Sequence, residues 1–158
     1  MIVRDATPGD IPAIAAYWNP LIETTTITFA TSPRSPADLA AMLAERPWFL
    51  VAEDGGQVIG HATSAQFRDG EGYAPCHEHT IMVDPDAHAA GVGRALMEAL
   101  EDRARAAGVA VMVGAICGEN AAAVSFHADL GYVETGRMPR IGRKFGRWLD
   151  LVLMQKTL

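Results

Sequence analysis

The centre of the sequence has the pattern of two strands connected by one long helix. The stretch HEHTIMV (77–83) leads into the turn DPDAHAAG (84–91), and an amphipathic helix follows and ends at Gly108. Its apolar stripe is Leu96, Ala99, Leu100, Ala104 and Ala107. The next run, VAVMVGAI (109–116), is continuously apolar, which is typical of a strand covered on both faces. This order predicts a strand–helix–strand crossover at the centre of a mixed α/β fold.

Turn and capping signals divide the rest of the chain. TPGD (7–10) and SPAD (35–38) are capping boxes that predict the starts of two helices. The Asp-Gly turn in DGGQ (54–57) predicts an antiparallel hairpin between WFLVAE (48–53) and VIGHATSAQF (58–67). The other predicted elements are a strand in MIVRDA (1–6), a short helix in NAAAVSFHADLG (120–131), and strands in YVETGRM (132–138) and WLDLVLMQ (148–155). The order β-α-α-β-β-β-α-β-α-β-β, without repeats or a linker, indicates one domain over residues 1–158.

Charge and composition exclude several classes of protein. The 158 residues carry 13 Lys and Arg against 19 Asp and Glu, a net charge of −6, and no basic run marks a nucleic-acid surface. No apolar run approaches the roughly 20 residues that span a bilayer, and MIVRDATPGD (1–10) lacks the apolar region of a signal peptide. Cys76 and Cys117 form neither a disulfide framework nor a zinc spacing. We therefore expect a cytoplasmic protein that binds neither nucleic acid nor a membrane.

The turn before the central helix is a candidate anion site. A helix that starts near Gly91 presents amides without intrahelical partners, and the helix dipole adds a partial positive charge there. Gly91 and Gly93 lack the Cβ atoms that block close backbone approach, and Arg94 adds a charge. The spacing is neither G-x-G-x-x-G nor a P-loop. From these residues alone, a helix start with two flexible glycines is the competing interpretation.

Together with its surroundings, the turn resembles the signature of the GNAT superfamily of acetyl-CoA-dependent N-acetyltransferases. That signature is [Gln/Arg]-x-x-Gly-x-[Gly/Ala], where x is any residue. It matches HAAGVG (88–93), except that His88 stands in the first position. The chain is more narrowly similar to the phosphinothricin and methionine sulfoximine acetyltransferases, in HEHTIMV (77–83), ENAAAVSFHADLGY (119–132) and GRMPRIGRKFGRWLDLVLMQ (136–155). The resemblance runs from about Ile2 to the C-terminus. It implies the GNAT fold, a mixed sheet flanked by helices whose central parallel strands splay apart.

The resemblance implies a site for acetyl-CoA as co-substrate. Backbone amides of the turn hold the pyrophosphate, and the preceding strand pairs with the pantetheine arm as with an added strand. The expected residues are Ala89, Ala90, Gly91, Val92, Gly93 and Arg94 for the pyrophosphate, Ile81, Met82 and Val83 for the arm, and Asn120 for a hydrogen bond to the arm. The acetyl thioester is expected between the splayed strands. His88 and Ala89 depart from the usual pattern, so we expect main-chain amides rather than side chains to carry the binding.

Two residues are expected to move protons. Acetyl transfer needs a base for the acceptor ammonium and benefits from an acid for the leaving thiolate. Glu78 matches the family base, with a solvated strand carboxylate as the alternative. His127 matches the histidine that this subfamily carries where many GNAT members have tyrosine, and it is the candidate acid, with a packed helix histidine as the alternative. The HEH triplet also suggests a metal site, but alternation points His77 and His79 away from Glu78 and no third ligand is evident, so we expect no metal.

The acceptor is expected near Arg68, which matches a family arginine suited to a carboxylate. Asp69 and Gly70 follow it where close relatives carry Pro and an aromatic residue, a difference that bears on the substrate more than on the reaction. Phe29 lies in the threonine-rich linker NPLIETTTITFATSPR (19–34), whose length indicates a functional loop, and it is a candidate apolar wall or a core residue. The other expected substrate contacts are Glu78, His79 and Thr80. Residues expected near a second subunit of a homodimer are Lys144, Phe145 and Trp148.

The sequence therefore predicts a cytoplasmic N-acetyltransferase that moves acetyl from acetyl-CoA to the α-amino group of a small amino acid or analogue. Methionine sulfoximine, methionine sulfone and phosphinothricin are the acceptors that the resemblance implies. Another small amine or antibiotic as acceptor is the first alternative. A non-catalytic acyl-CoA sensor, which does not need Glu78, and a nucleotide-binding protein are the alternatives of a different class.

Overall fold

The computed structural model describes residues 1–87 and 90–158. Its helices are α1 (Ile11–Thr24), α2 (Pro36–Glu45), α3 (Val92–Ala106) and α4 (Ala121–Asp129), with short 3-10 turns at Pro8–Asp10 and Glu71–Tyr73. Its strands are β1 (Ile2–Asp5), β2 (Trp48–Asp54), β3 (Gln57–Gln66), β4 (Cys76–Val83), β5 (Val111–Cys117), β6 (Val133–Lys144) and β7 (Arg147–Thr157). The predicted order of helices and strands is confirmed.

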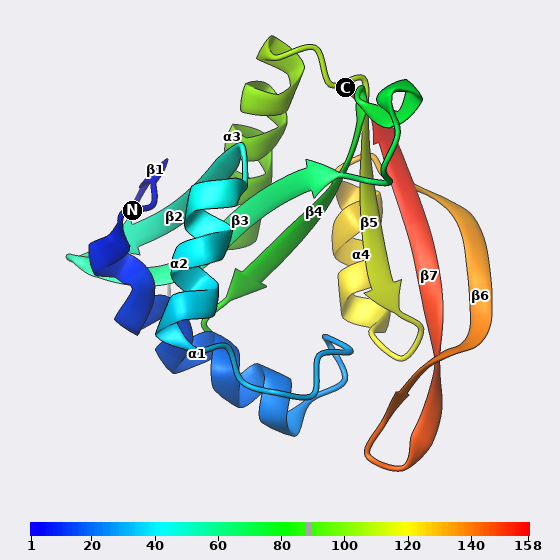
Figure 1. Cartoon of the computed structure of the whole chain (residues 1–158), viewed down its shortest axis with the longest axis horizontal. Helices are drawn as coiled ribbons and strands as arrows, with labels where there is room; N and C mark the ends of the chain where they lie inside the picture. Colours follow the sequence, from blue (N-terminus) through cyan, green and yellow to red (C-terminus); the bar gives the residue numbers. More distant parts are fainter. Residues whose placement is uncertain (88–89) are drawn as a thin grey trace.

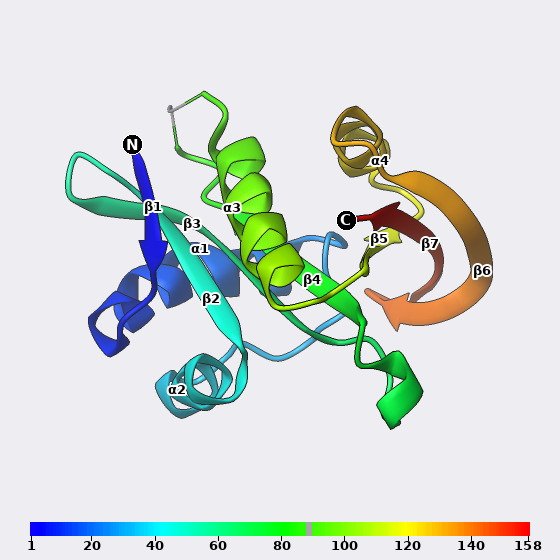
Figure 2. The same cartoon turned by 90° about the horizontal axis from the view of Figure 1, so that it is seen from above.

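All seven strands form one mixed sheet in the order β1-β2-β3-β4-β5-β7-β6. Neighbouring strands are antiparallel except for β4 and β5, which are parallel and are connected through α3. Figures 1 and 2 show α1 and α2 on one face of the sheet and α3 and α4 on the other. The crossover predicted from the centre of the sequence therefore connects the antiparallel strands β1 to β4 with the strands β5, β7 and β6.

Each face of the sheet has its own apolar core. On the α3 face, Leu96 and Leu100 are fully buried with Met112 of β5. On the α1 face the core consists of Ile14, Tyr17, Trp18, Ile22, Leu39, Phe49 and Val51. Strand β4 contributes to both, because Ile81 packs against the first cluster and Met82 against the second. By the period of a strand, Glu78 and Thr80 share the α1 face with Met82, and His79 shares the α3 face with Ile81.

The two parallel strands part soon after they meet. Only Cys76–Glu78 of β4 pair with 111–113 of β5, whereas β5 stays paired with β7 along Val111–Cys117. Beyond Glu78, the β5-facing edge of β4 has no strand partner within residues 1–87 and 90–158. Figure 1 shows the two strands diverging. The splayed central strands expected from the resemblance are confirmed.

Two element boundaries differ from those expected by more than two residues. Helix α1 continues through Pro20 to Thr24, because Ile22 remains on its buried face, so the functional loop spans 25–35 rather than 19–34. Strand β6 continues past Met138 to Lys144, because it pairs with β7 up to a tight turn at Phe145 and Gly146, both with positive φ (52° and 74°). In the described part of the chain, no helix combines the length and the apolar character that crossing a membrane requires.

Candidate active site

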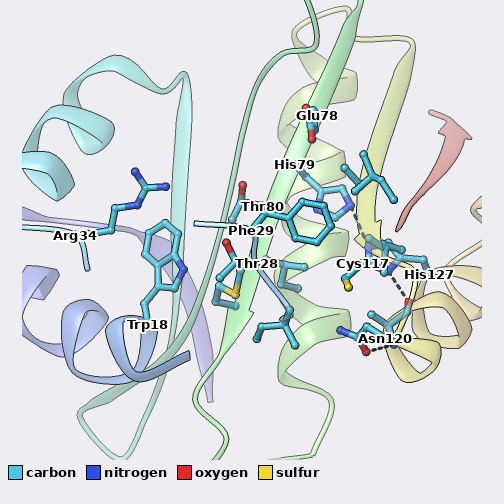
Figure 3. Close-up of a pocket in the computed structure, with 17 residues that line it drawn as sticks. Trp18, Thr28, Phe29, Arg34, Glu78, His79, Thr80, Cys117, Asn120 and His127 are labelled. Atoms are coloured by element: carbon cyan, nitrogen blue, oxygen red, sulfur yellow. Dashed lines mark hydrogen bonds between the residues drawn. The ribbon is translucent and has the colours of Figure 1, made fainter. Parts of the chain in front are cut away.

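A cavity of about 320 Å³ lies where β4 and β5 separate. Figure 3 shows the side chains around it. Its lining residues are Trp18, Ile27, Thr28, Phe29, Arg34, Glu78, His79, Thr80, Ile81, Met82, Ala115, Ile116, Cys117, Asn120, Ala123, His127 and Leu151. The loop 25–35 and both central strands therefore meet at one site. It brings together eight of the residues proposed from the sequence: Phe29, Glu78, His79, Thr80, Ile81, Met82, Asn120 and His127.

The start of α3 has the geometry of an anion site. Gly91 is the N-cap in the left-handed conformation (φ 77°), and the first helical hydrogen bond runs from Ala95 N to Gly91 O (3.0 Å). The amides of the first turn, up to that of Arg94, accordingly have no intrahelical acceptor. Ala90 and Gly91 are exposed beside them. His88 and Ala89, also expected in this turn, lie outside the described residues.

Gly93 has a packing reason for lacking a side chain. A Cβ at this position would lie 3.0 Å from Phe126 Cζ and 3.2 Å from Phe126 Cε2, so an alanine fits between α3 and α4 only if the Phe126 ring moves by a few tenths of an ångström. The sequence interpretation of Gly93 invoked only the approach of a phosphate. Gly91 is different, because nothing lies within 4 Å of its added Cβ and the positive φ alone favours glycine.

The edge of β4 suits an extended acyl carrier. Ile81 and Met82 line the cavity, and the unpaired edge past Glu78 offers backbone donors and acceptors in the spacing of a strand. Asn120 caps α4, because its Oδ1 accepts a hydrogen bond from Ala123 N (3.0 Å), and this fixes the side chain at the cavity wall. The residues at this edge and at the start of α3 thus fit the pantetheine arm and the pyrophosphate of acetyl-CoA.

Glu78 lies half-buried on the wall of the cavity, at the last residue pair before the strands part. Burial raises the pKa of its carboxyl group, and the positive charge of Arg46 opposes this rise. A carboxylate with a raised pKa is a stronger base than the carboxylate of an exposed glutamate. The site thus places a basic carboxylate where the unpaired edge of β4 begins.

His79 and His127 form a buried pair with a defined proton pattern. Their Nε2 atoms are 3.1 Å apart, and His127 Nδ1 lies 2.7 Å from the carbonyl oxygen of Ala123. Since a carbonyl only accepts, His127 Nδ1 donates to it, and the bare Nε2 of neutral His127 accepts from His79. Burial lowers the pKa of both histidines, that of His79 to about 3, so the pair is neutral at pH 7. For His127 to act as the predicted acid, this proton pattern must change.

Gly114 of β5 makes room for the pair, because an added Cβ would lie 3.0 Å from His79 Nε2. His77 is separate from it and lies 3.1 Å from Ser64 Oγ through its Nδ1. Within the residues that the structure describes, no cluster of three or more His, Cys, Asp or Glu side chains could hold a metal ion.

The loop 25–35 forms the wall opposite the central strands and is fastened to the β6–β7 hairpin. The ring of Phe29 lies directly over Gly142, and Lys144 Nζ donates a hydrogen bond to the carbonyl of Thr28 (2.9 Å). Lys144 is 4% exposed, so it is occupied within its own chain rather than presented to a second subunit. Phe145 and Trp148, the other two residues expected at a subunit contact, are exposed.

Arg68, Asp69 and Gly70 do not line the cavity. They lie exposed in the segment after β3, where Gln66 Nε2 donates to the carbonyls of Arg68 (2.7 Å) and Gly70 (2.8 Å). The cationic side chain that does line the cavity is Arg34, and Trp18 lies beneath it. Neither residue was expected at the site from the sequence. Trp18 lies on the apolar face of the first helix, where a core residue is the ordinary interpretation. For Arg34, the length of the linker 19–34 was the one signal.

Comparisons with known proteins agree with this geometry. Residues 16–132 match the Acetyltransferase (GNAT) family. An L-methionine sulfoximine/L-methionine sulfone acetyltransferase of Pseudomonas aeruginosa is 38% identical over 161 aligned residues, which cover 99% of this chain and 94% of the relative. A crystal structure named ribosomal-protein-alanine N-acetyltransferase from Brucella melitensis superimposes with a TM-score of 0.96 at 36% identity and covers 100% of both chains. A phosphinothricin acetyltransferase from Sinorhizobium meliloti, solved in complex with AcCoA, gives 0.94 at 31% identity and covers 99% and 88%.

The match to the family extends over most of the chain, and the fold and the co-substrate expected from the sequence are confirmed. The chain therefore belongs to the GNAT family and is an acetyl-CoA-dependent N-acetyltransferase.

Proposed function

We propose that the protein, acting as a single catalytic domain, acetylates the α-amino group of a small amino acid or analogue. The observation that carries this proposal is the half-buried Glu78 at the split of the sheet, on the face that also carries the loop 25–35. The names of the relatives support acceptors of the methionine sulfoximine, methionine sulfone and phosphinothricin type. A cavity of about 320 Å³ is in keeping with an acceptor of that size.

The residues suggest a direct transfer in one ternary complex. Glu78 takes a proton from the acceptor ammonium, directly or through a water, and the free amine attacks the thioester carbonyl carbon. The C–N bond forms as the C–S bond breaks, the acetylated nitrogen loses its second proton to water, and coenzyme A leaves as a thiolate that requires a proton. His127 is the proposed donor, and the His79–His127 pair must first take up or rearrange a proton to place one on the Nε2 atom of His127.

The amides at the start of α3 and the free edge of β4 are the proposed holders of the co-substrate. Ala90 to Arg94 would bind the pyrophosphate, and Ile81 to Val83 would bind the pantetheine arm with help from Asn120. Ala89 is proposed for the same turn from the sequence alone. These roles use main-chain groups, so side-chain substitutions at Ala90 or Arg94 are expected to matter less than changes of backbone conformation at Gly91.

A protein N-terminus is the second candidate acceptor, because the Brucella melitensis structure is named for ribosomal-protein alanine acetylation. The test is thiol release from acetyl-CoA with two sets of acceptors. One set holds methionine sulfoximine, methionine sulfone, phosphinothricin and ordinary amino acids, and the other holds peptides that begin with alanine. We expect turnover with the first set. Turnover restricted to the peptides would contradict the proposed acceptor class.

Glu78→Gln separates an enzyme from an acyl-CoA sensor. The amide cannot take a proton, so we expect kcat to fall by about 10²- to 10⁴-fold while the affinity for acetyl-CoA, measured by calorimetry, stays at the wild-type value. Glu45→Gln, an exposed carboxylate at the end of α2, is the matched control and is expected to be fully active. Equal rates for the two variants would remove Glu78 from the mechanism.

We also propose a homodimer formed through the β6–β7 hairpin. Its exposed apolar side chains are Val133, Met138, Ile141, Phe145 and Trp148. Arg140 and Arg143 flank the ring of Trp148 at 5.2 and 4.9 Å, which gives the surface the aromatic and arginine character common at interfaces. Light scattering after size exclusion should give a dimer for the wild type and a monomer for Phe145→Asp combined with Trp148→Asp. The cytoplasmic location stays a prediction from the sequence.

A further inference from the structure

Two buried N–H groups at one end of the cavity have no hydrogen-bond acceptor within residues 1–87 and 90–158. Trp18 is 2% exposed, and its Nε1 has no partner among the described residues. Arg34 Nε is likewise buried without a partner in that part of the chain, and both side chains line the cavity. Buried donors are satisfied in the great majority of cases, so two unsatisfied donors on side chains that line one cavity point to an acceptor that binds beside them.

The contacts that hold Arg34 and Trp18 in place do not use these two N–H groups. The Arg34 guanidinium lies over the Trp18 ring, 5.4 Å from its centroid. The backbone of Arg34 is fixed separately, because Arg34 N donates to Asn19 Oδ1 (2.8 Å) and Asn19 Nδ2 donates to Arg34 O (3.0 Å). Figure 3 shows Arg34 and Trp18 together, on the opposite side of the view from His127 and Asn120. Removing the guanidinium therefore leaves the backbone anchor of the loop intact.

The charges around the cavity match a zwitterion. Of the described residues that line it, Arg34 is the only lysine or arginine and Glu78 the only carboxylate. Glu78 shares the sheet face of Met82, and Met82 packs with the α1 cluster that contains Trp18, so the guanidinium, the indole and the carboxylate belong to one face. An acceptor with an ammonium group and an anionic oxygen group is complementary to this arrangement.

We propose that Arg34 and Trp18 form the subsite for the anionic oxygens of the acceptor, a carboxylate or a phosphinate. The Arg34 guanidinium supplies the charge and Trp18 Nε1–H a second donor. The inference rests on the proposed function and departs from the sequence-based expectation, which gave this role to Arg68. Arg68 is exposed and lies outside the cavity lining, and nothing in the structure aims its side chain at Glu78.

The test compares Arg34→Gln, Trp18→Phe and Arg68→Gln in steady-state kinetics. For phosphinothricin and methionine sulfone, we expect Arg34→Gln to raise the KM by about 10- to 100-fold, since it removes a charge-assisted hydrogen bond, while the KM for acetyl-CoA is unchanged. Trp18→Phe keeps an aromatic ring, smaller than the indole, and removes one donor, so a smaller rise, about 3- to 10-fold, is expected. Arg34→Lys keeps the charge without the Nε–H and should fall between Arg34→Gln and the wild type. Arg105→Gln, at a surface ion pair of α3, is the control.

The carboxamide of methionine sulfone identifies the source of the anion. If the α-carboxylate binds at the subsite, the wild type loses affinity for the carboxamide and Arg34→Gln adds no further loss. If a side-chain anion binds there, the effect of Arg34→Gln is confined to phosphinothricin. The proposal is overturned if Arg34→Gln has the same acceptor KM as the control Arg105→Gln, or if only Arg68→Gln raises the acceptor KM. A wild type that acetylates none of these compounds refutes the proposed function instead.

Discussion

Replacement of Gly142 by alanine tests whether the loop 25–35 sets the shape of the acceptor cavity. An added Cβ would lie 2.5 Å from both Cδ2 and Cε2 of Phe29, about 0.9 Å short of the 3.4 Å at which ordinary contact begins. The ring cannot keep its place, and it lines the cavity. Overpacking of this kind destabilises a fold by about 1 to 3 kcal/mol. For a chain of this length, that corresponds to a fall in Tm of about 2 to 12 °C.

The same displacement should appear in the kinetics. Phe29 lies on the proposed acceptor wall rather than on the proposed co-substrate edge, so the KM for the acceptor should rise while the KM for acetyl-CoA stays constant. Gly136→Ala, in the same strand, is the control, because nothing lies within 4 Å of its added Cβ. Thermal unfolding followed by circular dichroism and thiol-release kinetics provide the two measurements.

A double variant decides whether the clash is the cause. Phe29→Leu combined with Gly142→Ala relieves the contact, so the loss of stability in the double variant should be smaller than the sum of the two single losses. Strict additivity, or equal Tm and acceptor KM values for Gly142→Ala and Gly136→Ala, would refute the packing of Phe29 on Gly142 as the constraint on the cavity.

Three further predictions concern pH and packing. The positive charge of Arg46 lowers the pKa of Glu78, so Arg46→Gln should move the acid limb of kcat/KM to higher pH, and a shift to lower pH would contradict the assignment of Glu78. Burial lowers the pKa of His61 from 6.5 to about 3, so between these pH values the histidine is protonated in the unfolded chain but not in the folded protein. The free energy of unfolding should therefore fall as the pH drops from 6.5 towards 3, and urea titrations of His61→Phe should show a smaller fall over this range. The added Cβ of Gly93→Ala contacts Phe126, so the change in Tm that it causes should be more favourable in a Phe126→Leu background than in the wild type, and equal changes would contradict this contact.

Local chemistry made much of the fold predictable from the sequence. The capping box at Ser35 forms as expected, with Asp38 N donating to Ser35 Oγ and Ser35 N donating to the Asp38 carboxylate. The turn at Gly55 and Gly56 has the two positive φ angles that a two-residue hairpin needs. Such features depend on residues close in sequence. The extension of α1 past Pro20 was missed because burial of Ile22 outweighs the local penalty of a proline.

Residues expected for the acceptor, such as Phe29 and Glu78, and residues of the proposed co-substrate edge line the cavity, whereas Arg34 and Trp18 were not expected there. Ile81, Met82 and Asn120 follow a strand and a helix cap that are visible in the sequence. Arg34 reaches the cavity only because the loop folds back over α1 and is held by Asn19, a tertiary contact that has no periodic signal. For Gly93, the sequence indicated that a glycine matters at this position but not why. The Phe126 ring that restricts the position lies 33 residues further along the chain, so the local pattern could not reveal the contact.

In the proposed binding mode, acetyl-CoA pairs with the edge of β4 that is left free where the two central strands part after three residue pairs. A ligand that binds only the folded chain adds to the free energy of unfolding, by about 2.7 kcal/mol when its concentration is a hundred times its Kd. The unfolded fraction, which proteases degrade, therefore shrinks when acetyl-CoA is plentiful and grows when it is scarce. Through this linkage, we expect the supply of the acetyl donor to change the resistance of the enzyme to proteolysis as well as its rate.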